Sequence, residues 1–369
     1  QVEKIVKAFK YAAQNSAPVA ATVLHTCGSC ASILSTWSQR NFERKSTVQL
    51  QLTQLVDWDK KEVTDLGSVE TTAELMAEHS PSATYRALFR ETPATGKNPK
   101  KQFLEVWKKN KITKVIDLTA LEVHGDVYTD YEFGSFEWSQ KEDKLLFIAE
   151  KKCPKSEPFI STKSCSKSQE EGSTKGSEYV YLEDWGESLV GKSCPVAVVC
   201  DLGSEDVRVL EGVPEDLSVG QVVWAPNGDG VVGVAWQTTP RRLGIVYCTN
   251  RTSWIFHLTP DNIFRKLSGP NLAVRSPQFS PDGRSLVWLE RPAGGPHHAC
   301  HRLIKYDWES NQLSTVIDIV QEETKCVNGE PFFGLYNMSL RKCWLSDNKT
   351  ILLSTQQRAS VQTYLIDTG

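Results

Sequence analysis

Hydrophobic and polar residues follow two different patterns along the chain. Between Glu3 and Ala13, apolar residues recur at helical spacing with lysines between them, which predicts a helix. From Ser46 onward, apolar and polar residues alternate with a period of two, which is typical of β-strands. The patterns predict a helical N-terminal extension over residues 1–25 and strands that begin near residue 46.

A short pattern of hydrophobic and polar residues, which we call the repeated unit, occurs several times along the chain. It consists of an aromatic residue, a small residue, a turn with Asp or Asn, and an apolar run. In the clearest copy, Ser280, Pro281, Asp282 and Gly283 stand in the order that β-turns favour, so we predict a hairpin at each copy. The copies begin at Trp138, Trp224, Phe279 and Trp344, and a weaker one begins at His79.

The apolar run after each turn does not alternate, as in LVWL at 286–289, which is typical of a strand covered on both faces. A short apolar strand that ends in Asp follows each run, and another extended stretch comes after it. Each unit therefore supplies about four strands, and the chain is predicted to be all-β, a β-propeller of four-stranded blades. The Asp-ending strands end at Asp117, Asp201, Asp307 and Asp367, and residues 255–257 form the same element without its Asp.

The propeller is assigned to residues 26–369, with irregular spacing between copies that indicates insertions in loops. The largest insertion, residues 151–177, is rich in Lys, Ser, Glu and Gly and lacks apolar periodicity, so we expect a mobile surface loop. The chain stops after an Asp-ending strand, where the unit requires a further strand. We therefore expect the last blade to be incomplete.

The composition is that of a soluble globular protein, with 40% hydrophobic and 24% charged residues. Eleven Trp against two Met favour β-rich packing. A net charge of -3 and a pI near 6.2 provide no electrostatic footprint for nucleic acid or an anionic membrane. Without a signal peptide or an apolar span, the protein is predicted to be cytoplasmic and to bind neither nucleic acid nor membrane.

The cysteines and histidines give weak signals for metal or redox chemistry. Ten cysteines are scattered along the chain, which fits reduced thiols in a reducing compartment. Cys27 and Cys30 form the only CxxC motif, for which we favour a structural role. The segment 297–301 contains three histidines and a cysteine, but its Gly-Gly-Pro lead indicates a loop between strands. We predict no metal site and no cofactor.

No catalytic residue is assigned. The chain contains no Gly-x-Ser-x-Gly motif, and residues 172–176 have Ser at the wrong position for a nucleophile elbow. Asp282, Asp307 and Asp367 are interpreted as turn and strand-end residues because local turn chemistry explains them. Trp185 stands among acidic residues and fits either a binding patch or a core position, and we favour the core.

Several blocks of the chain resemble the propeller portion of animal acylaminoacyl-peptidases, which are prolyl-oligopeptidase-like serine peptidases. The order and approximate spacing of these blocks are preserved from about residue 36 to the end. They read KQFLEVW at 101–107, LTALE at 118–122 with HG at 124–125, AEKK at 149–152, YLEDWGE at 181–187, LEGVPE at 210–215, RLGI at 242–245 with CTNR at 248–251, and PHH at 296–298.

The resemblance implies that the chain caps an α/β-hydrolase domain and lets only short peptides reach its active site. In that family the catalytic Ser, Asp and His follow the propeller, so none is carried over to this chain. The implied partners are short N-acylated peptides, the chain's own catalytic domain, and further copies in a homo-oligomer. The alternative is a stand-alone propeller that acts as a protein-interaction scaffold, although the irregular spacing of the blades argues against it.

Overall fold

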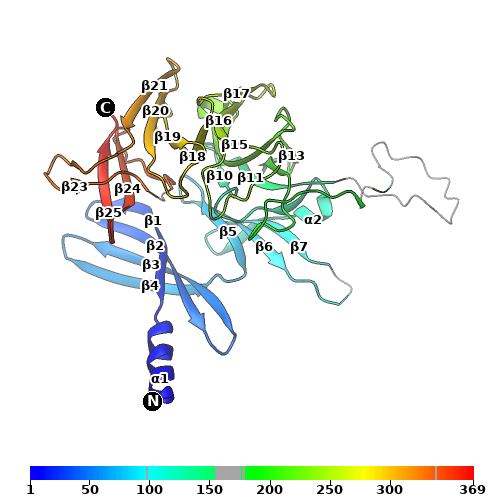
Figure 1. Ribbon diagram of the computed structural model, residues 1–369. Helices are drawn as coiled ribbons and strands as arrows, with labels where there is room; N and C mark the ends of the chain where they lie inside the picture. The colour runs from blue at the N-terminus through cyan, green and yellow to red at the C-terminus, as the bar shows by residue number, and fades with distance from the viewer. Residues whose placement is uncertain (97–98, 154–175, 177–178, 337–338) are drawn as a thin grey trace. The chain divides into compact units, whose positions relative to one another are not determined.

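The computed structural model describes residues 1–369 except 97–98, 154–175, 177–178 and 337–338. The described chain is mostly β-strand with an N-terminal helix (Figure 1). It divides into two compact units, Gln1–Leu118 and Thr119–Gly369. No helix within the described ranges is long and apolar enough to cross a membrane. The predicted loop over residues 151–177 lies almost wholly outside the described residues.

The first unit contains the predicted helix and two four-stranded antiparallel sheets. The helix α1 spans Val2–Ala13. The strands of the first sheet are β1 (Ala17–Cys27), β2 (Cys30–Asn41), β3 (Ser46–Asp57) and β4 (Glu62–Glu70). The strands of the second sheet are β5 (Glu74–His79), β6 (Tyr85–Thr92), β7 (Lys101–Lys108) and β8 (Lys111–Asp117).

The prediction that strands begin near residue 46 is wrong, because β1 and β2 precede that position. The reason lies in burial. Most of β1 is exposed to solvent, so neither of its faces requires an apolar residue at every second position. The sequence of β1 therefore lacks the alternation that identifies a half-buried strand. The division into residues 1–25 and 26–369 stays a prediction.

The second unit begins within the helical turn α2 (Leu118–Leu121) and contains three larger sheets and two small ones. The first sheet is formed by β9 (His124–Val127), β10 (Phe136–Trp138), β11 (Lys144–Lys151), β12 (Pro195–Asp201) and β13 (Val207–Val209). The next is formed by β14 (Leu217–Trp224), β15 (Val231–Gln237), β16 (Ser253–Leu258) and β17 (Phe264–Lys266), with the turn η2 (Pro226–Gly228) between β14 and β15. The third is formed by β18 (Leu272–Phe279), β19 (Ser285–Pro292), β20 (Arg302–Asp307) and β21 (Gln312–Ile317). The small sheets are β22 (Thr324–Lys325) with β23 (Pro331–Phe332), and β24 (Thr350–Gln357) with β25 (Ser360–Asp367).

The predicted hairpins are confirmed at Trp138, Trp224, Phe279 and His79, where the turn connects neighbouring antiparallel strands. At the fourth aromatic copy, Trp344 pairs with Ile351 only as an isolated antiparallel bridge. At the clearest copy, the Ser280 hydroxyl donates a hydrogen bond to Asp282 at 2.6 Å, and Gly283 closes the turn at a φ of +73°. Asp201 and Asp307 end the third strands of their sheets, as expected. Asp117 instead ends β8, the fourth strand of its sheet, because the third strand β7 ends in Lys108.

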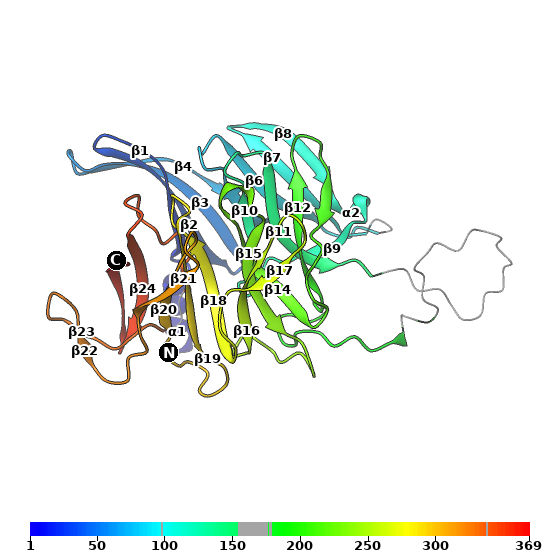
Figure 2. The same cartoon turned by 90° about the horizontal axis from the view of Figure 1, so that it is seen from above.

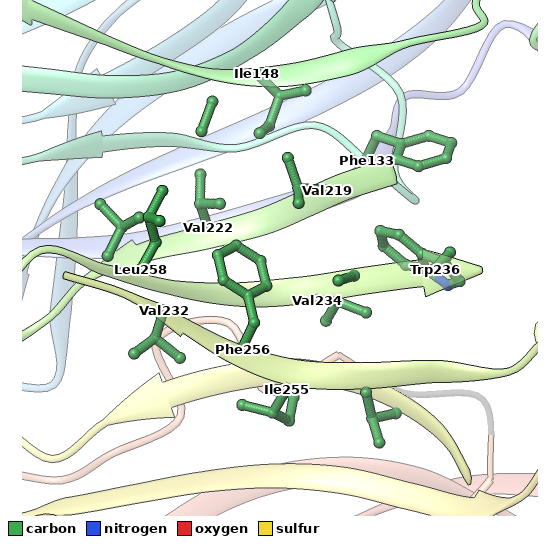
Figure 3. Close-up of a cluster of buried hydrophobic side chains, with 14 of the residues drawn as sticks. Phe133, Ile148, Val219, Val222, Val232, Val234, Trp236, Ile255, Phe256 and Leu258 are labelled. Carbon is green, nitrogen blue, oxygen red and sulfur yellow. The ribbon is translucent and has the colours of Figure 1, made fainter. Parts of the chain in front are cut away.

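The main hydrophobic core lies between the sheets of the second unit, which follow one another in chain order (Figure 2). The middle strands β15 and β19 are buried on both faces, which confirms the interpretation of the apolar runs. Figure 3 shows Ile148, Val219, Val232 and Phe256 converging from neighbouring strands. Fully burying such a side chain contributes about 1.5–3 kcal/mol relative to leaving it exposed.

The strand β24 differs from these middle strands because its residues are alternately buried and exposed. Its apolar run was expected to be covered on both faces. Ile351 and Leu353 are buried, but Leu352 between them is 45% exposed. Within the described ranges this sheet has two strands, and one face of β24 alternates to exposed residues where β15 and β19 are buried. The expectation is therefore wrong for one face of this strand.

Candidate functional site

Buried polar residues gather where β10, β14 and β18 meet, the strands that begin the four-stranded path of each larger sheet of the second unit, together with residues of β19 and of the loop after it. The strand β10 contacts β14, and β14 contacts β18. We call the residues gathered there the first-strand cluster, and it consists of Glu132, Gln221, Arg275, Arg291 and His301. All of them are buried except Gln221, which is half-buried. Since buried polar groups are costly unless they are paired, these residues are the candidates for a role beyond packing.

Two β-bulges position the backbone and side-chain groups that form the hydrogen bonds of the cluster. The pairing of β14 with β15 shifts after Gly220, and the pairing of β18 with β19 shifts after Arg275. Within these bulges Gln221 and Ser276 adopt positive φ angles of 50° and 56°. A bulge changes the direction in which a side chain points, and here it lets the Gln221 amide reach the segments on both sides of β14.

The Gln221 amide connects three successive segments. Its Nε2 donates to the carbonyl oxygen of Glu132 at 2.8 Å, and its Oε1 accepts from the Ser276 backbone N–H at 2.7 Å. The Gln221 backbone N–H also donates to the carbonyl of Phe133 at 3.1 Å. One side chain therefore joins β14 both to the segment before β10 and to β18.

Sequence reasoning missed Gln221, although one signal was present. A glycine inside an apolar strand indicates a bulge or a close approach of another backbone. Gly220 stands at such a position, and a Cβ atom there would lie 2.9 Å from the carbonyl oxygen of Phe133. The partner of a bulge depends on register and on the neighbouring sheet, which the local pattern does not encode.

An ion pair crosses the cluster between Glu132 and Arg275, with 3.7 Å between Oε2 and Nη2. Burial raises the pKa of Glu132, while the positive charge of Arg275 opposes that effect. The Nε of Arg275 has no hydrogen-bond partner among the described residues. The ion pair therefore does not use every hydrogen-bond donor of Arg275.

Arg291 and His301 add a second charged centre, and both side chains are almost fully buried, with 1% and 2% exposed. The Arg291 guanidinium donates to the carbonyls of Ala299 and His297 and to the hydroxyl of Thr249, at 3.0–3.1 Å. Burial lowers the pKa of Arg291, and the charge of Arg275 adds to that effect. All three of these acceptors are uncharged.

Burial, with the charges of Arg291 and Arg275 added, lowers the pKa of His301 to about 3. This imidazole is neutral at pH 7. The cluster then holds two guanidinium groups and one carboxyl group and has excess positive charge. It contains no Ser, Cys or Thr nucleophile, so its chemistry is electrostatic.

The histidine-rich segment 297–301 is not assembled into a metal site. His297 and His298 are exposed in the loop between β19 and β20, which confirms the predicted loop, whereas Cys300 and His301 are buried. Within the described ranges, no group of three or more His, Cys, Asp or Glu side chains could hold a metal ion. The segment instead supplies the backbone carbonyls that receive Arg291.

The three predicted turn aspartates are confirmed as structural residues. The Asp282 carboxylate accepts from the Ser280 hydroxyl and the Arg284 N–H, and these bonds lower its pKa. The Asp307 carboxylate accepts from the Ser310 N–H and hydroxyl, which lowers its pKa as well. Asp367 accepts from the Gly369 N–H at 2.9 Å.

The core interpretation of Trp185 is confirmed. The indole is 1% exposed and packs against Phe133 with 5.1 Å between ring centroids. It therefore belongs to the hydrophobic core and does not form a surface binding patch. The Ser-containing motif at 172–176 lies outside the described residues apart from Gly176.

Four-stranded antiparallel sheets that follow one another along the chain place this protein in the class of β-propellers. The family model of the acylamino-acid-releasing enzyme N-terminal domain matches residues 2–367. The chain therefore belongs to the family of acylamino-acid-releasing enzymes, as the resemblance in the sequence predicted.

Similar proteins agree with this assignment. The acylamino-acid-releasing enzyme of Homo sapiens is 41% identical over 350 residues, a match that covers 90% of this chain and 47% of that protein. Acylamino-acid-releasing enzyme 1 of Oryza sativa subsp. japonica is 32% identical over 289 residues and covers 68% of this chain and 36% of that protein. The chain spans about half the length of the mammalian relatives, 47% of each.

Solved structures confirm the fold. Pyrococcus horikoshii acylaminoacyl peptidase matches 97% of this chain and 46% of its own chain, with a TM-score of 0.53 and 12% identity. The β-propeller domain of the trilobed protease from Pyrococcus furiosus matches 96% of this chain and 82% of its own chain, with a TM-score of 0.50 and 14% identity. At these identities the likeness shows the fold alone.

Proposed function

We propose that this chain is the substrate-size filter and cap of a serine peptidase that releases N-acylamino acids from short N-acylated peptides. The observation that carries the proposal is the match of residues 2–367 to the N-terminal domain of acylamino-acid-releasing enzymes. The mammalian relatives are about twice as long as this chain. We assign the nucleophile, base and oxyanion hole to the part of the enzyme outside this chain.

The proposed filter acts by sterics and needs a stiff frame. The blades of a propeller surround a central channel, and we place the first strands beside it. A narrow channel excludes folded chains whatever their sequence, whereas a short peptide loses less conformational entropy on entering. The Gln221 amide, which connects β14 to both of its neighbours, supports such a frame. Arg275 lies in β18, and the other guanidinium of the cluster, that of Arg291, lies in the neighbouring strand β19.

The remaining partners belong to the same proposal. The enzyme would act in the cytoplasm as a homo-oligomer, with its own catalytic domain covering one side of this chain. The net charge of -3 is consistent with a protein that binds neither nucleic acid nor an anionic membrane.

The test compares this chain with a version extended through its natural downstream sequence. Release of acetyl-alanine is measured from a short acetylated peptide and from an acetylated peptide several times longer. We expect activity only in the extended protein and only on the short peptide. Equal rates on both peptides would overturn the filter, and inactivity of the extended protein would favour the interaction scaffold. Activity of this chain alone would overturn the assignment of the catalytic groups to the rest of the enzyme.

A further inference from the structure

Cys27 and Cys30 lie directly opposite each other at the closed end of the β1–β2 hairpin. The register pairs Cys27 with Cys30 across the two-residue turn Gly28-Ser29. Gly28 has a φ of +57°, as the first central residue of a type II′ turn requires. Directly opposed residues of an antiparallel pair point to the same face, with Cα atoms about 5.5 Å apart where the pair is hydrogen-bonded. Disulfides span Cα separations of about 4.4–6.8 Å, so the two thiols are placed for a bond.

Solvent reaches this pair. Both cysteines are free thiols, Cys27 exposed and Cys30 half-buried. The space beside the turn is open, since no atom beyond Gly28 and its two chain neighbours lies within 4 Å of the position that a Cβ on Gly28 would occupy. A small disulfide can therefore approach Cys27, and the turn has room to adjust.

Charged side chains surround the second thiol. Asp57 lies directly opposite Cys30 in β3. The Lys60 ammonium lies 3.1 Å from the Asp57 carboxylate. The thiolate is the form of cysteine that attacks disulfides.

We propose that Cys27 and Cys30 form a reversible thiol–disulfide site that reacts with low-molecular-weight disulfides such as glutathione disulfide. The Cys27 thiolate attacks one sulfur of the small disulfide, whose S–S bond breaks and releases one glutathione thiolate. The Cys30 thiolate then attacks the sulfur of Cys27 and releases the second glutathione. Two protein thiols lose two electrons and two protons, and one glutathione disulfide becomes two glutathione molecules.

The bond should be easily reduced. Cβ atoms of directly opposed residues are about 4.5–5.5 Å apart, whereas those of a disulfide are about 3.5–4.5 Å apart. Closing the bond therefore draws the end of the hairpin together and strains it. Strained and exposed disulfides are the labile ones, which gives the site its reversibility.

The sequence allows a direct measurement on the intact chain. No Lys or Arg lies between Lys10 and Arg40, so trypsin releases residues 11–40, in which Cys27 and Cys30 are the only cysteines. The folded protein is equilibrated at rising ratios of glutathione disulfide to glutathione, blocked with N-ethylmaleimide, digested without reductant and weighed. We expect the doubly blocked peptide to give way to a bridged peptide two hydrogen atoms lighter than the reduced form. Excess glutathione should restore the doubly blocked peptide.

Matched controls separate bridging from simple modification. Cys326, half-buried and alone in the tryptic peptide 326–341, should carry only a glutathione or N-ethylmaleimide adduct. Cys30→Ser should accumulate glutathione on Cys27, and Cys27→Ser should form no bridge. A wild-type peptide 11–40 that keeps two N-ethylmaleimide groups at every ratio, or that gains glutathione adducts without bridging, would overturn the proposal. A bridge that excess glutathione leaves intact would overturn its reversibility. The site does not depend on the proposed peptidase function.

Discussion

His301 shows how a single residue can report on the first-strand cluster. Its folded-state pKa of about 3 is far below the unfolded value of about 6.5. The unfolded chain therefore binds one proton more than the folded chain between these two values. The stability that neutral His301 contributes is present above pH 6.5 and is lost as the pH falls toward the folded pKa.

Replacing His301 with Gln should remove this pH dependence. We expect wild-type stability to fall between pH 6.5 and 5 by up to about 1.4 kcal/mol per pH unit from this residue, and the difference between wild type and H301Q to shrink accordingly. Urea unfolding at pH 7.0, 6.0 and 5.0 measures that difference. The exposed His297 serves as the control, since H297Q keeps the carbonyl that receives Arg291. A constant difference between wild type and H301Q would contradict the expected neutral state.

At the scale of strands and sheets, neighbouring sheets are joined by repeated hydrogen bonds as well as by apolar packing. The indole N–H of Trp224 donates to the carbonyl of Glu137, and that of Trp344 donates to the carbonyl of Gln278. In both cases the donor begins a repeated unit, and the acceptor lies in the strand that begins the path of an earlier sheet, β10 or β18. The bulge at Gln221 adds a side-chain link of the same kind.

The Gln221 link should be measurable as stability. Gln221→Ala removes the oxygen that accepts a hydrogen bond from the backbone N–H of the buried residue Ser276. Because a buried donor without an acceptor is costly, we expect the free energy of unfolding to fall by about 1–3 kcal/mol. Gln237→Ala is the matched control, because this exposed amide donates only to the nearby carbonyl of Thr239 and should change stability by less than about 0.5 kcal/mol. Urea unfolding at pH 7 compares the two variants. Equal effects would mean that the amide is not a link between sheets.

The elements also show what the sequence could predict. Turns with the Ser-Pro-Asp-Gly order and continuous apolar runs identified the hairpins and middle strands, since φ preferences and two-sided burial are local requirements. The sequence did not predict the exposed strand β1 or the alternating burial of β24, because burial depends on which elements cover a strand. The first-strand cluster could not be predicted from the sequence for a similar reason. Glu132 and Arg275 are far apart in sequence, and only the order of sheets brings them together.

At the scale of the whole chain, the last strand determines how the protein should behave in solution. Among the described residues, the strand β25 pairs only with β24, so its other edge has backbone donors and acceptors without a strand partner there. Val361 and Leu365 on this strand are 67% and 68% exposed. An apolar, unprotected edge is a template for pairing with another chain. We therefore expect this chain, expressed alone, to associate as its concentration rises.

A charge on the edge should weaken that association. Leu365→Lys places an ammonium on the exposed side of β25 and leaves the buried Ile366 unchanged. We expect the weight-average mass from light scattering to rise with concentration for the wild type and to stay near that of a single chain for L365K. Val327→Lys is the control, because Val327 is fully exposed but lies outside the edge strand. If V327K suppressed association as strongly as L365K, general apolar contact would be responsible instead of strand pairing. A wild type that stayed monodisperse at all concentrations would show that the edge is protected.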